Sequence, residues 1–442
     1  MVEKILVLGL SKSGISAAKL AKNLGYEVYL TEGKSEVNLE QVVELQNLGI
    51  KVEYGSHSDE FINGSKLVIT SPGIPPKSEI FKRIQEKNIS IISEIEFAYK
   101  NTQSPFIAIT GTNGKTTTTA LVSHILNDNF KAPFCGNIGV PPCDLAQENN
   151  DYLVCEISSY QAQTTDDFKP FISCWTNFTP DHIDWHEGLE NYFKAKAKLF
   201  LGKQAPKYAI FNAKDSKLLE FAKECKDSKV FMFDTENAPN ASYVKDDAIW
   251  YKTEGLEERI ISLKDCPLVG HHNYQNIMCG IICAKLCGMK NAEIKDSIMS
   301  FKAPEHRLEK VCELNGITFY NDSKATNPEA SIVAIDSFNN VDVALILGGR
   351  DKNTDLTEMC DSINKHIKTV FLIGEATERF EENLKKNGFD NIIKEETMES
   401  AIDKAISLKP DVVLLSPACA SFDMFKSYEH RGEVFKEYVL SK

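Results

Sequence analysis

The sequence has no long apolar run and no excess of positive charge. None of its hydrophobic stretches reaches the roughly 18 residues that cross a bilayer, so we expect no membrane span and no membrane partner. Its 50 basic and 63 acidic residues give a formal net charge of −13. A nucleic-acid binder needs a basic face, so we expect no nucleic-acid partner. Any anionic ligand must be held by a few local lysines, arginines and backbone N–H groups.

The chain also lacks a CxxC pair among its twelve cysteines, which disfavours a zinc ribbon. Its start, MVEKILVLGL, carries Glu3 in a short apolar run and predicts a strand rather than a signal peptide. Cysteines without an export signal predict reduced thiols and a cytoplasmic location. Cys279, Cys283 and Cys287 recur every fourth residue, and we expect them to pack in a core rather than bind a metal.

The length of 442 residues suggests about three domains. Apolar, strand-like runs alternate with amphipathic stretches throughout, which predicts α/β domains with parallel sheets. We place the domains at residues 1–93, 94–302 and 303–442, with a joint near YKNTQSPF. The strands expected in the first domain are KILVLGL, YEVYLTE, LVITSPG and ISIISE, and those in the last are ITFYNDS, VALILGG, TVFLIGE and VVLLSPA. Residues 248–263 predict a hairpin.

The stretch IAITGTNGKTT, residues 107–117, is typical of a phosphate-binding loop. A strand leads into a glycine-rich turn, and Lys115 and Thr116 then open a helix. Glycines let backbone N–H groups approach a phosphate, the helix start and Lys115 add positive charge, and Thr116 can hold Mg²⁺. The spacing is shorter than the usual GxxxxGK[ST]. The predicted ATP contacts here are Gly111, Thr112, Asn113, Gly114, Lys115, Thr116 and Thr117.

Candidate metal ligands follow at the ends of the next strands. Glu156 ends the run DYLVCEISS, and Asp181, His182, Asp184 and His186 fall within six residues of TNFTPDHIDWH. Alone, this cluster could be a solvated loop. Strand ends in one open α/β sheet meet at one edge, however, which favours a shared ligand site with the phosphate loop.

Several stretches together resemble the Mur ligases of peptidoglycan synthesis: TGTNGKTTT, Glu156 with SSYQ, NFTPDHIDWH, YFKAKAKLF, GHHNYQN, HRLE and YNDSKATNP. The resemblance covers essentially the whole chain in order. It implies three α/β domains: a Rossmann-like UDP-binding domain, a central P-loop ATPase-type domain and a Rossmann-like third domain. SPGI at 71, LGGRDKN at 347 and LLSPACASFDMFKSYEHRGEVF look most like the branch that adds D-glutamate to UDP-N-acetylmuramoyl-L-alanine.

The resemblance implies ATP-dependent amide formation through an acyl phosphate. It assigns ATP and two Mg²⁺ ions as cofactors, with Thr116 and Glu156 at the first ion and His182 at the second. A carbamylated lysine serves the second ion in this family. Of Lys194, Lys196 and Lys198, Lys196 fits the pattern best, so Lys115, His182 and Lys196 are the expected catalytic residues. His186 has no role in the resemblance, and we expect it at the surface or behind the site.

The other site residues are carried over by position. GLSKSG spaces its glycines as GxxxxG, a weak match to the dinucleotide fingerprint GxGxxG. The resemblance makes it part of the UDP-sugar site, although LTEGK departs from some relatives near the uracil. The expected UDP-substrate contacts are Ser11, Ser13, Gly14, Thr31, Glu32, Ser71, Gly73 and Asn137. Further ATP contacts are Asn273, Arg307 and Asp322, and D-glutamate contacts are Lys324, Thr326, Lys352, Ser421 and Tyr428.

Three alternatives remain open. One is a different Mur or folate-type ligase, which would share the ATP chemistry but take another substrate. Another is a nicotinamide-dependent oxidoreductase using the first domain, disfavoured by the missing middle glycine. The third is a non-catalytic nucleotide-binding module. We expect a monomer that acts on small molecules, needs no partner protein and closes its domains around the substrates.

Overall fold

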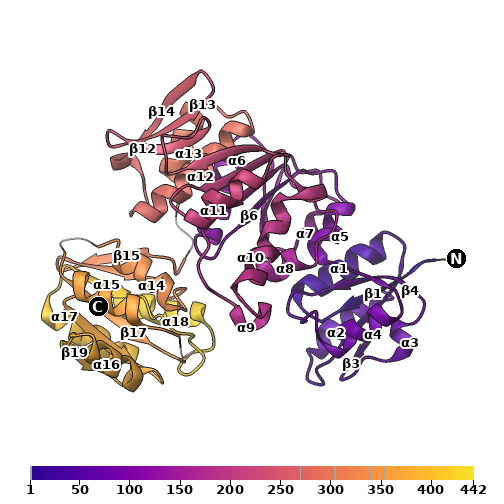
Figure 1. The fold of residues 1–442 in the computed structure, drawn as a ribbon. Helices are drawn as coiled ribbons and strands as arrows, with labels where there is room; N and C mark the ends of the chain where they lie inside the picture. Colours follow the sequence, from indigo (N-terminus) through magenta and orange to yellow (C-terminus); the bar gives the residue numbers. More distant parts are fainter. Residues whose placement is uncertain (1, 269, 303–304, 339–340, 352–353) are drawn as a thin grey trace. The chain divides into compact units, whose positions relative to one another are not determined.

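The computed structural model describes residues 2–268, 270–302, 305–338, 341–351 and 354–442. Three separate sheets follow one another along the chain (Figure 1). The chain divides into two compact units, Met1–Cys266 with Gln275–Phe301, and Pro267–Tyr274 with Lys302–Lys442. The segment Pro267–Tyr274 thus groups with the last third of the chain, and the three domain boundaries stay predictions. Among the described residues, no helix is long and apolar enough to cross a membrane.

The first sheet is parallel, with strand order β3-β2-β1-β4-β5. Its strands are β1 (Lys4–Leu8), β2 (Glu27–Glu32), β3 (Lys51–Tyr54), β4 (Ser65–Thr70) and β5 (Ser90–Ser93), and its helices are α1 (Lys12–Asn23), α2 (Leu39–Asn47), α3 (Asp59–Ile62) and α4 (Glu79–Glu86). The central strand β1 is apolar on both faces because helices cover both faces of a parallel sheet. The prediction missed β3, a short edge strand whose sequence KVEY is half charged and partly exposed.

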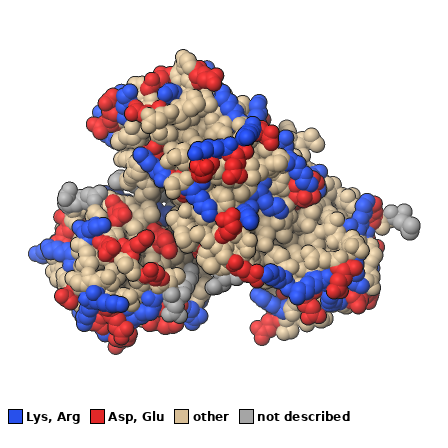
Figure 2. Space-filling model, viewed as in Figure 1, with Lys and Arg blue, Asp and Glu red and all other residues tan. Residues whose placement is uncertain are grey.

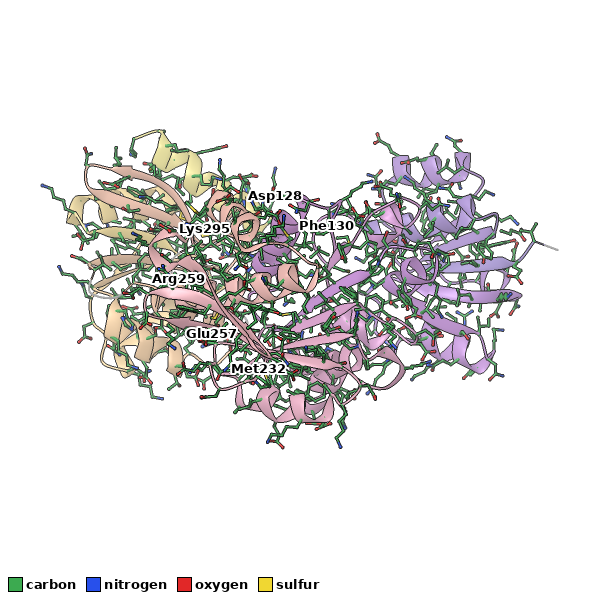
Figure 3. The ribbon with its side chains drawn as sticks, turned by 90° about the horizontal axis from the view of Figure 1, so that it is seen from above. Asp128, Phe130, Met232, Glu257, Arg259 and Lys295 are labelled. Carbon is green, nitrogen blue, oxygen red and sulfur yellow. The ribbon has the colours of Figure 1, made fainter. Side chains whose placement is uncertain are left out.

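The second sheet has nine strands in the order β14-β13-β12-β11-β10-β9-β6-β8-β7. They are β6 (Phe106–Thr110), β7 (Phe134–Gly136), β8 (Leu153–Glu156), β9 (Ile172–Trp175), β10 (Tyr208–Asn212), β11 (Lys229–Phe233), β12 (Ala241–Lys245), β13 (Ala248–Thr253) and β14 (Leu256–Ser262). The strands from β7 to β12 run parallel, and β13 and β14 form the predicted hairpin. In Figure 3, the labelled residues Met232 on β11 and Glu257 and Arg259 on β14 mark the part of the sheet that ends at the edge strand β14.

The region around the second sheet contains nine described α-helices, of which α6 begins directly after the phosphate loop. They are α5 (Glu94–Lys100), α6 (Lys115–Asn127), α7 (Pro142–Leu145), α8 (Ser159–Gln163), α9 (Ile183–His186), α10 (Leu189–Ala197), α11 (Ser216–Phe221), α12 (His271–Leu286) and α13 (Asn291–Ser300), with 3-10 turns at Lys198–Phe200, Gly202–Gln204, Ala222–Glu224 and Leu263–Asp265. One hydrophobic cluster joins the first sheet to the second, from Ile5 and Val7 to Trp175 and Phe211. Cys279 and Cys283 are fully buried, as predicted, and Cys287 is partly buried.

The third sheet has six strands in the order β15-β16-β20-β17-β18-β19. They are β15 (Glu309–Leu314), β16 (Ile317–Asn321), β17 (Val343–Gly348), β18 (Thr369–Ile373), β19 (Ile392–Lys394) and β20 (Val412–Leu415), with α14 (Pro328–Ile335), α15 (Thr357–His366), α16 (Thr377–Lys386), α17 (Met398–Leu408) and α18 (Tyr428–Leu440). All pairings are parallel except β15 with β16. The predicted strands are present. The two that were missed, β15 and β19, are edge strands with charged or exposed residues.

Candidate active site

The predicted phosphate loop is a tight turn between β6 and α6. Gly111 and Gly114 have φ angles of 149° and 79°, which L-residues rarely adopt. A Cβ on Gly111 would lie 1.9 Å from the Thr176 Oγ1 atom, and one on Gly114 would lie 2.9 Å from the Asn276 Oδ1 atom. Only glycine fits at either position. The two glycines therefore let the loop pack closely against Thr176 and Asn276 in a conformation typical of phosphate-binding turns.

The end of β9 holds this loop in shape. Asn177 accepts from the Thr112 backbone N–H at 3.0 Å through its carbonyl and from the Asn113 N–H at 2.8 Å through its side chain. The Thr176 hydroxyl donates to the Asn113 carbonyl at 2.6 Å. The Lys115 ammonium donates to the Gly111 and Thr112 carbonyls at 2.9 and 2.8 Å. These bonds fix the turn that leads into the N-terminus of α6, where the first backbone N–H groups of a helix have no partner within the helix.

Glu156 lies at the end of β8, where the sequence places it, and is 1% exposed. Its Oε1 atom accepts from the Asn137 side-chain amide at 2.7 Å. Its Oε2 atom is buried and has no hydrogen-bond partner among the described residues. Burying a charged oxygen without a partner is costly, so this atom fits a site that receives a cation. Asn137, predicted at the UDP substrate, therefore contacts the predicted metal ligand directly.

Of the three candidate lysines at the end of α10 and the start of the next 3-10 turn, Lys196 is the one that faces the loop. It is 1% exposed, and its Nζ atom donates to the Gly111 carbonyl at 2.8 Å and to the Thr110 hydroxyl at 3.3 Å. Burial, followed by the nearby positive charge of Lys115, lowers the pKa of Lys196 well below its usual value. A neutral amine is the form that reacts with CO₂ to give a carbamate. Lys194 and Lys198 lie on the exposed side of the helix.

His182 begins α9 in a cluster of rings. Its φ is 52°, its side chain is 43% exposed, and its Nε2 atom lies 3.3 Å from the Asp181 carboxylate. The ring centroids of His182 and Tyr160 are 4.9 Å apart. His186 is buried rather than at the surface, and its Nε2 atom lies 2.9 Å from the Ser159 hydroxyl. Burial lowers the pKa of His186 to about 4. The side chain of Asp184 lies outside the described part of the chain.

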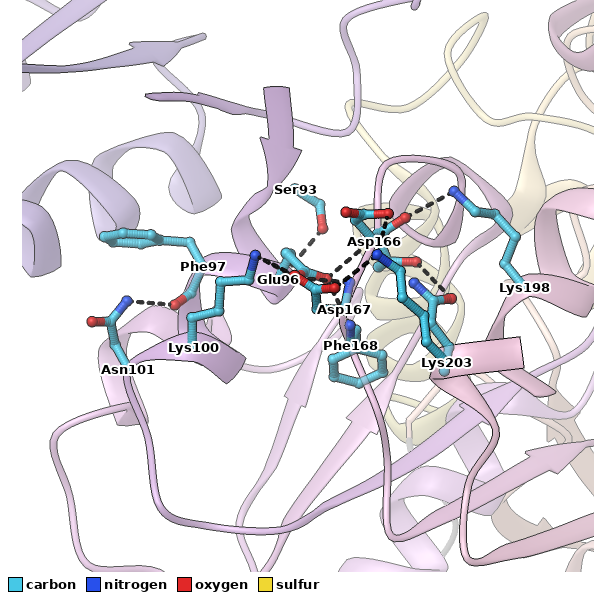
Figure 4. A network of polar contacts seen from close by, with 12 residues as sticks. Ser93, Glu96, Phe97, Lys100, Asn101, Asp166, Asp167, Phe168, Lys198 and Lys203 are labelled. Atoms are coloured by element: carbon cyan, nitrogen blue, oxygen red, sulfur yellow. Dashed lines mark hydrogen bonds and ion pairs between the residues drawn. The ribbon is translucent and has the colours of Figure 1, made fainter. Parts of the chain in front are cut away.

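A second buried carboxylate fixes the segment that follows α8 (Figure 4). Glu96 of α5 is 0% exposed and accepts from three consecutive backbone N–H groups, those of residues 166–168, at 2.9–3.0 Å. Its carboxylate also pairs with Lys100 at 3.1 Å. The Lys198 ammonium holds the same segment from the other side, donating to the Gln163 and Thr165 carbonyls. This network ties α8, which follows Glu156, to the end of the helix that carries Lys196.

In the first domain, the predicted UDP contacts gather around the β1–α1 turn. Ser11 caps α1, and its hydroxyl donates to the Ser71 hydroxyl at 2.9 Å and lies 3.0 Å from that of Ser13. A Cβ on Gly14 would lie 2.0 Å from the Gly9 carbonyl oxygen, so the turn approaches the helix closely.

Two of the remaining predicted residues in this domain have their side chains engaged by the protein. Glu32 accepts from the Leu10 backbone N–H at 2.9 Å and so closes over the β1–α1 turn. Thr31 is fully buried and donates to the Glu53 carboxylate at 2.8 Å, so its side chain does not face the opening. Gly73 lies exposed in the loop after β4.

The predicted residues of the third domain gather at the ends of β16 and β20. Asp322 is 8% exposed and accepts from the Ser416 hydroxyl at 2.7 Å and the Leu308 N–H at 3.1 Å. Burial raises the pKa of Asp322 to about 7. The Lys324 ammonium lies 3.6 Å from the centre of the Tyr428 ring. Ser421 is buried, Thr326 and Arg307 are partly buried, and Lys352 lies outside the described residues.

Three functional candidates were not found from the sequence. Asn276 accepts from the Thr118 hydroxyl at 2.9 Å and lies against Gly114, one helical turn after the predicted Asn273. Tyr192 lies 3.1 Å from the Thr112 hydroxyl. Arg431 is 1% exposed and donates to the Ser323 and Cys419 carbonyls, which joins two loops of the third domain. In the sequence, Asn276 is indicated only by its position about one helical turn after the predicted Asn273, which places both on a similar face of α12.

The described side chains form no broad surface patch of a single charge on the face drawn in Figure 2. On the face drawn in Figure 2, lysine and arginine side chains are interspersed with aspartate and glutamate. Among the described side chains, no three of His, Cys, Asp or Glu lie close enough together to hold a metal ion. Mg²⁺ commonly takes one or two carboxylates and completes its shell with water and substrate phosphates, which such a site allows.

Three family profiles match the chain in order. They are Mur ligase MurD-like, N-terminal domain, over residues 3–93, Mur ligase middle domain over 109–284, and Mur ligase, glutamate ligase domain, over 306–419. Two UDP-N-acetylmuramoylalanine--D-glutamate ligases are similar over 99% of this chain. The one from Thermoanaerobacter pseudethanolicus is 39% identical with 98% of its own length covered, and the one from Bacillus cytotoxicus is 37% identical with 97% covered.

Solved structures show the same fold at low identity. A pseudomurein peptide ligase type C from Methanothermus fervidus aligns with a TM-score of 0.62 and 14% identity, covering 98% of this chain and 99% of that one. The UDP-N-acetylmuramate-alanine ligase from Thermotoga maritima aligns with a TM-score of 0.59 and 19% identity, covering 99% and 100%. The profiles, the relatives and the three-sheet α/β architecture agree, and the chain belongs to the Mur ligase family.

Proposed function

We propose that this protein joins D-glutamate to UDP-N-acetylmuramoyl-L-alanine with ATP, giving ADP and phosphate, in peptidoglycan precursor synthesis. The relatives that carry this activity in their names are 37–39% identical over 99% of the chain. The observation that carries the proposal is the convergence of three groups at one sheet edge. A glycine phosphate loop, the buried Glu156 and the buried Lys196 meet there, and Lys196 bonds directly to the loop.

The residues present fit ATP and magnesium. Glu156 offers a buried carboxylate oxygen that has no hydrogen-bond partner in the described part of the chain, and the loop excludes any side chain at Gly111. Thr116 and Glu156 would hold one Mg²⁺, and His182 with a carbamate on Lys196 would hold a second. Bound Mg²⁺ would neutralise the negative charge that the phosphates and the substrate carboxylate bring together. Two ions and the carbamate are part of the proposal.

A carboxylate does not react with an amine because oxide is a poor leaving group. In the proposed reaction, the L-alanine carboxylate takes the γ-phosphoryl group of ATP and becomes an acyl phosphate. The amine of D-glutamate attacks its carbonyl carbon, the new C–N bond forms, and phosphate leaves with the electron pair of the C–O bond. The protein supplies position and charge: N–H groups at the start of α6 and the Lys115 ammonium bind the phosphates.

Lys196 supports the carbamate proposal through its surroundings. Its amine is buried beside Lys115, and burial lowers its pKa, which favours the neutral, nucleophilic amine over the ammonium. Carbamylation would convert this amine into an anion, which the neighbouring Lys115 ammonium would attract rather than repel. The exposed Lys194 and Lys198 lack this environment.

The substrate sites follow from the same assignment. Ser11, Ser13, Gly14, Glu32, Ser71, Gly73 and Asn137 would contact the UDP-sugar, with Thr31 contributing at most its backbone because its side chain is buried. Asn273, Arg307 and Asp322 would complete the ATP site. Lys324, Thr326, Lys352, Ser421 and Tyr428 would bind D-glutamate. The monomeric state, the cytoplasmic location and domain closure stay predictions.

Product analysis tests this proposal. The protein is incubated with UDP-N-acetylmuramoyl-L-alanine, D-glutamate, ATP and Mg²⁺, and the sugar nucleotides are separated and weighed by mass spectrometry. We expect one new sugar nucleotide heavier by a glutamyl residue, with an equal amount of ADP. A Lys115→Ala variant is the matched negative control. Folded wild-type protein that forms ADP but no such product, or that joins glutamate to a folate instead, would contradict the assignment.

A further inference from the structure

A cavity of about 560 Å³ lies between the loop that follows β4 and the helices α8, α9 and α10, within the first compact unit. Small-molecule sites commonly enclose about 300–1,000 Å³, so the cavity has the size of a ligand site. Its lining includes none of the residues assigned above to ATP, the metal ions or the sugar nucleotide. The proposed function therefore leaves this cavity unexplained.

The cavity and the phosphate loop lie on opposite sides of α10. Lys194 and Lys198 line the cavity, whereas Lys196, between them, bonds to the Gly111 carbonyl at 2.8 Å. Residues two apart on an α-helix point about 200° apart, because each residue turns the helix by about 100°. The body of the helix thus separates the cavity from the expected position of the ATP phosphates.

The charges of the lining favour an anion. Lys77, Lys194 and Lys198 contribute three positive charges and Glu187 one negative charge, a sum of +2 in a chain whose net charge is −13. Glu187 forms an ion pair with Lys77. Among the described residues, the side-chain ammonium of Lys194 makes no hydrogen bond or ion pair. A phosphate monoester carries about −1.5 to −2 near neutral pH, so one such group would balance this charge.

The remaining lining offers a flat apolar wall and neutral hydrogen-bonding groups. Trp185, Pro75 and Pro76 contribute apolar surface to the lining, and the Trp185 Nε1 atom donates to the Gln163 side chain at 3.4 Å. His186 is 4% exposed and is held against Ser159. An indole face stacks well on another ring. The wall is therefore suited to a planar group rather than to a bare ion.

We propose that this cavity binds a phosphate monoester attached to an aromatic ring, at a site separate from those of ATP and the sugar nucleotide. The phosphate contacts the Lys194 ammonium and the one N–H of Lys198 that its bonds to the Gln163 and Thr165 carbonyls leave over, and the ring lies against Trp185. Lysines suit a phosphate dianion because each is a compact, mobile point charge. The proposal does not depend on the ligase reaction.

Tryptophan fluorescence offers a direct test with phenyl phosphate as the probe. The chain has three tryptophans, and of these Trp185 lines the cavity, Trp175 is fully buried and Trp250 lies in β13. We expect saturable quenching in the wild-type protein and none in Trp185→Phe. Lys194→Gln should weaken binding about fivefold, the loss of one partly solvated charge pair. Lys207→Gln removes an exposed charge elsewhere and should bind like the wild type.

Competition and calorimetry complete the test. Saturating ADP and UDP should leave the phenyl phosphate affinity unchanged, and inorganic phosphate should bind at least tenfold more weakly because it lacks the ring. Calorimetric titration of Trp185→Phe should show weakened binding, which separates lost affinity from a lost signal. Displacement by UDP would make the cavity part of the sugar-nucleotide site and overturn the proposal. Equal binding of inorganic phosphate, or no saturable binding at all, would also overturn it.

Discussion

Replacing Glu156 with glutamine separates the role of this residue in function from its role in stability. The carboxylate is 1% exposed, and one of its oxygens accepts from Asn137 at 2.7 Å while the other has no partner among the described residues. Glu156→Gln keeps the shape, keeps an oxygen for Asn137 and removes the charge. If the unpaired oxygen exists to receive Mg²⁺, the metal-free variant should gain stability.

The expected gain follows from the cost of the unpaired oxygen. A charged oxygen buried without a partner costs more than the neutral amide nitrogen that would replace it, so removing the charge should make metal-free Glu156→Gln more stable by about 1–3 kcal/mol. One kcal/mol shifts the unfolding midpoint by about 2–4 °C in a domain of about 200 residues. A ligand at 100 times its dissociation constant adds about 2.7 kcal/mol to the wild-type protein, and the variant should lose most of this gain. The stability order should therefore reverse when Mg²⁺ and ATP are added.

Thermal unfolding with and without Mg²⁺ and ATP measures both effects, and phosphate release should fall at least about 100-fold in the variant. Glu148→Gln is the matched control, because Glu148 is exposed and pairs with Lys131 at 2.9 Å on the surface. It should change neither quantity appreciably. A metal-free Glu156→Gln protein that is less stable than the wild type, yet still gains stability from Mg²⁺ and ATP, would show that the carboxylate is structural.

Three other substitutions test separate parts of the account. Lys196→Gln removes a buried amine, and we expect it to preserve the unfolding midpoint while the ligation rate falls at least about 100-fold. In a separate experiment on the wild-type protein, removing dissolved CO₂ should lower the activity until bicarbonate restores it. Retained activity in Lys196→Gln would refute the carbamate. Burial raises the pKa of Glu94 from 4.5 to about 7. Between these two pH values the folded state holds a proton that the unfolded state has lost. The free energy of unfolding of the wild-type protein should therefore fall by up to about 3 kcal/mol as the pH rises across that range. Denaturant titrations of Glu94→Gln should show a flatter pH dependence, and an unchanged slope would count against this assignment. Glu96→Gln leaves at least one of three backbone N–H groups without its partner, and the same titrations should show a free energy of unfolding lower by about 2–4 kcal/mol. A decrease below about 0.5 kcal/mol would show that the network in Figure 4 contributes little to stability.

Local sequence signals predicted the parts of the site that depend on local geometry. The phosphate loop could be predicted because Gly111 and Gly114 hold φ values of 149° and 79°, which few other residues tolerate. Glu156 could be placed because parallel strands end at a common edge. Lys196 could be chosen by its match to a family pattern, and its burial distinguishes it from its neighbours.

Features that depend on distant contacts were missed. Asn276 meets Thr118 across 158 residues of sequence, and Arg431 meets Ser323 across 108. Neither residue type signals burial in a lone sequence, since arginine and asparagine are usually exposed. Glu96 was also missed, because a helix glutamate gives no sign that it will accept from a loop 70 residues later. The edge strands β3, β15 and β19 lack the apolar pattern that burial on both faces imposes.

The D-glutamate assignment is tested most directly by phosphate release with a panel of amino acids. The protein is given ATP, Mg²⁺ and UDP-N-acetylmuramoyl-L-alanine, together with D-glutamate, L-glutamate, L-alanine, L-lysine or diaminopimelate in separate reactions. We predict sustained release with D-glutamate alone. Sustained release with another amino acid, and none with D-glutamate, would contradict the assignment of the third domain while leaving the ATP chemistry in place.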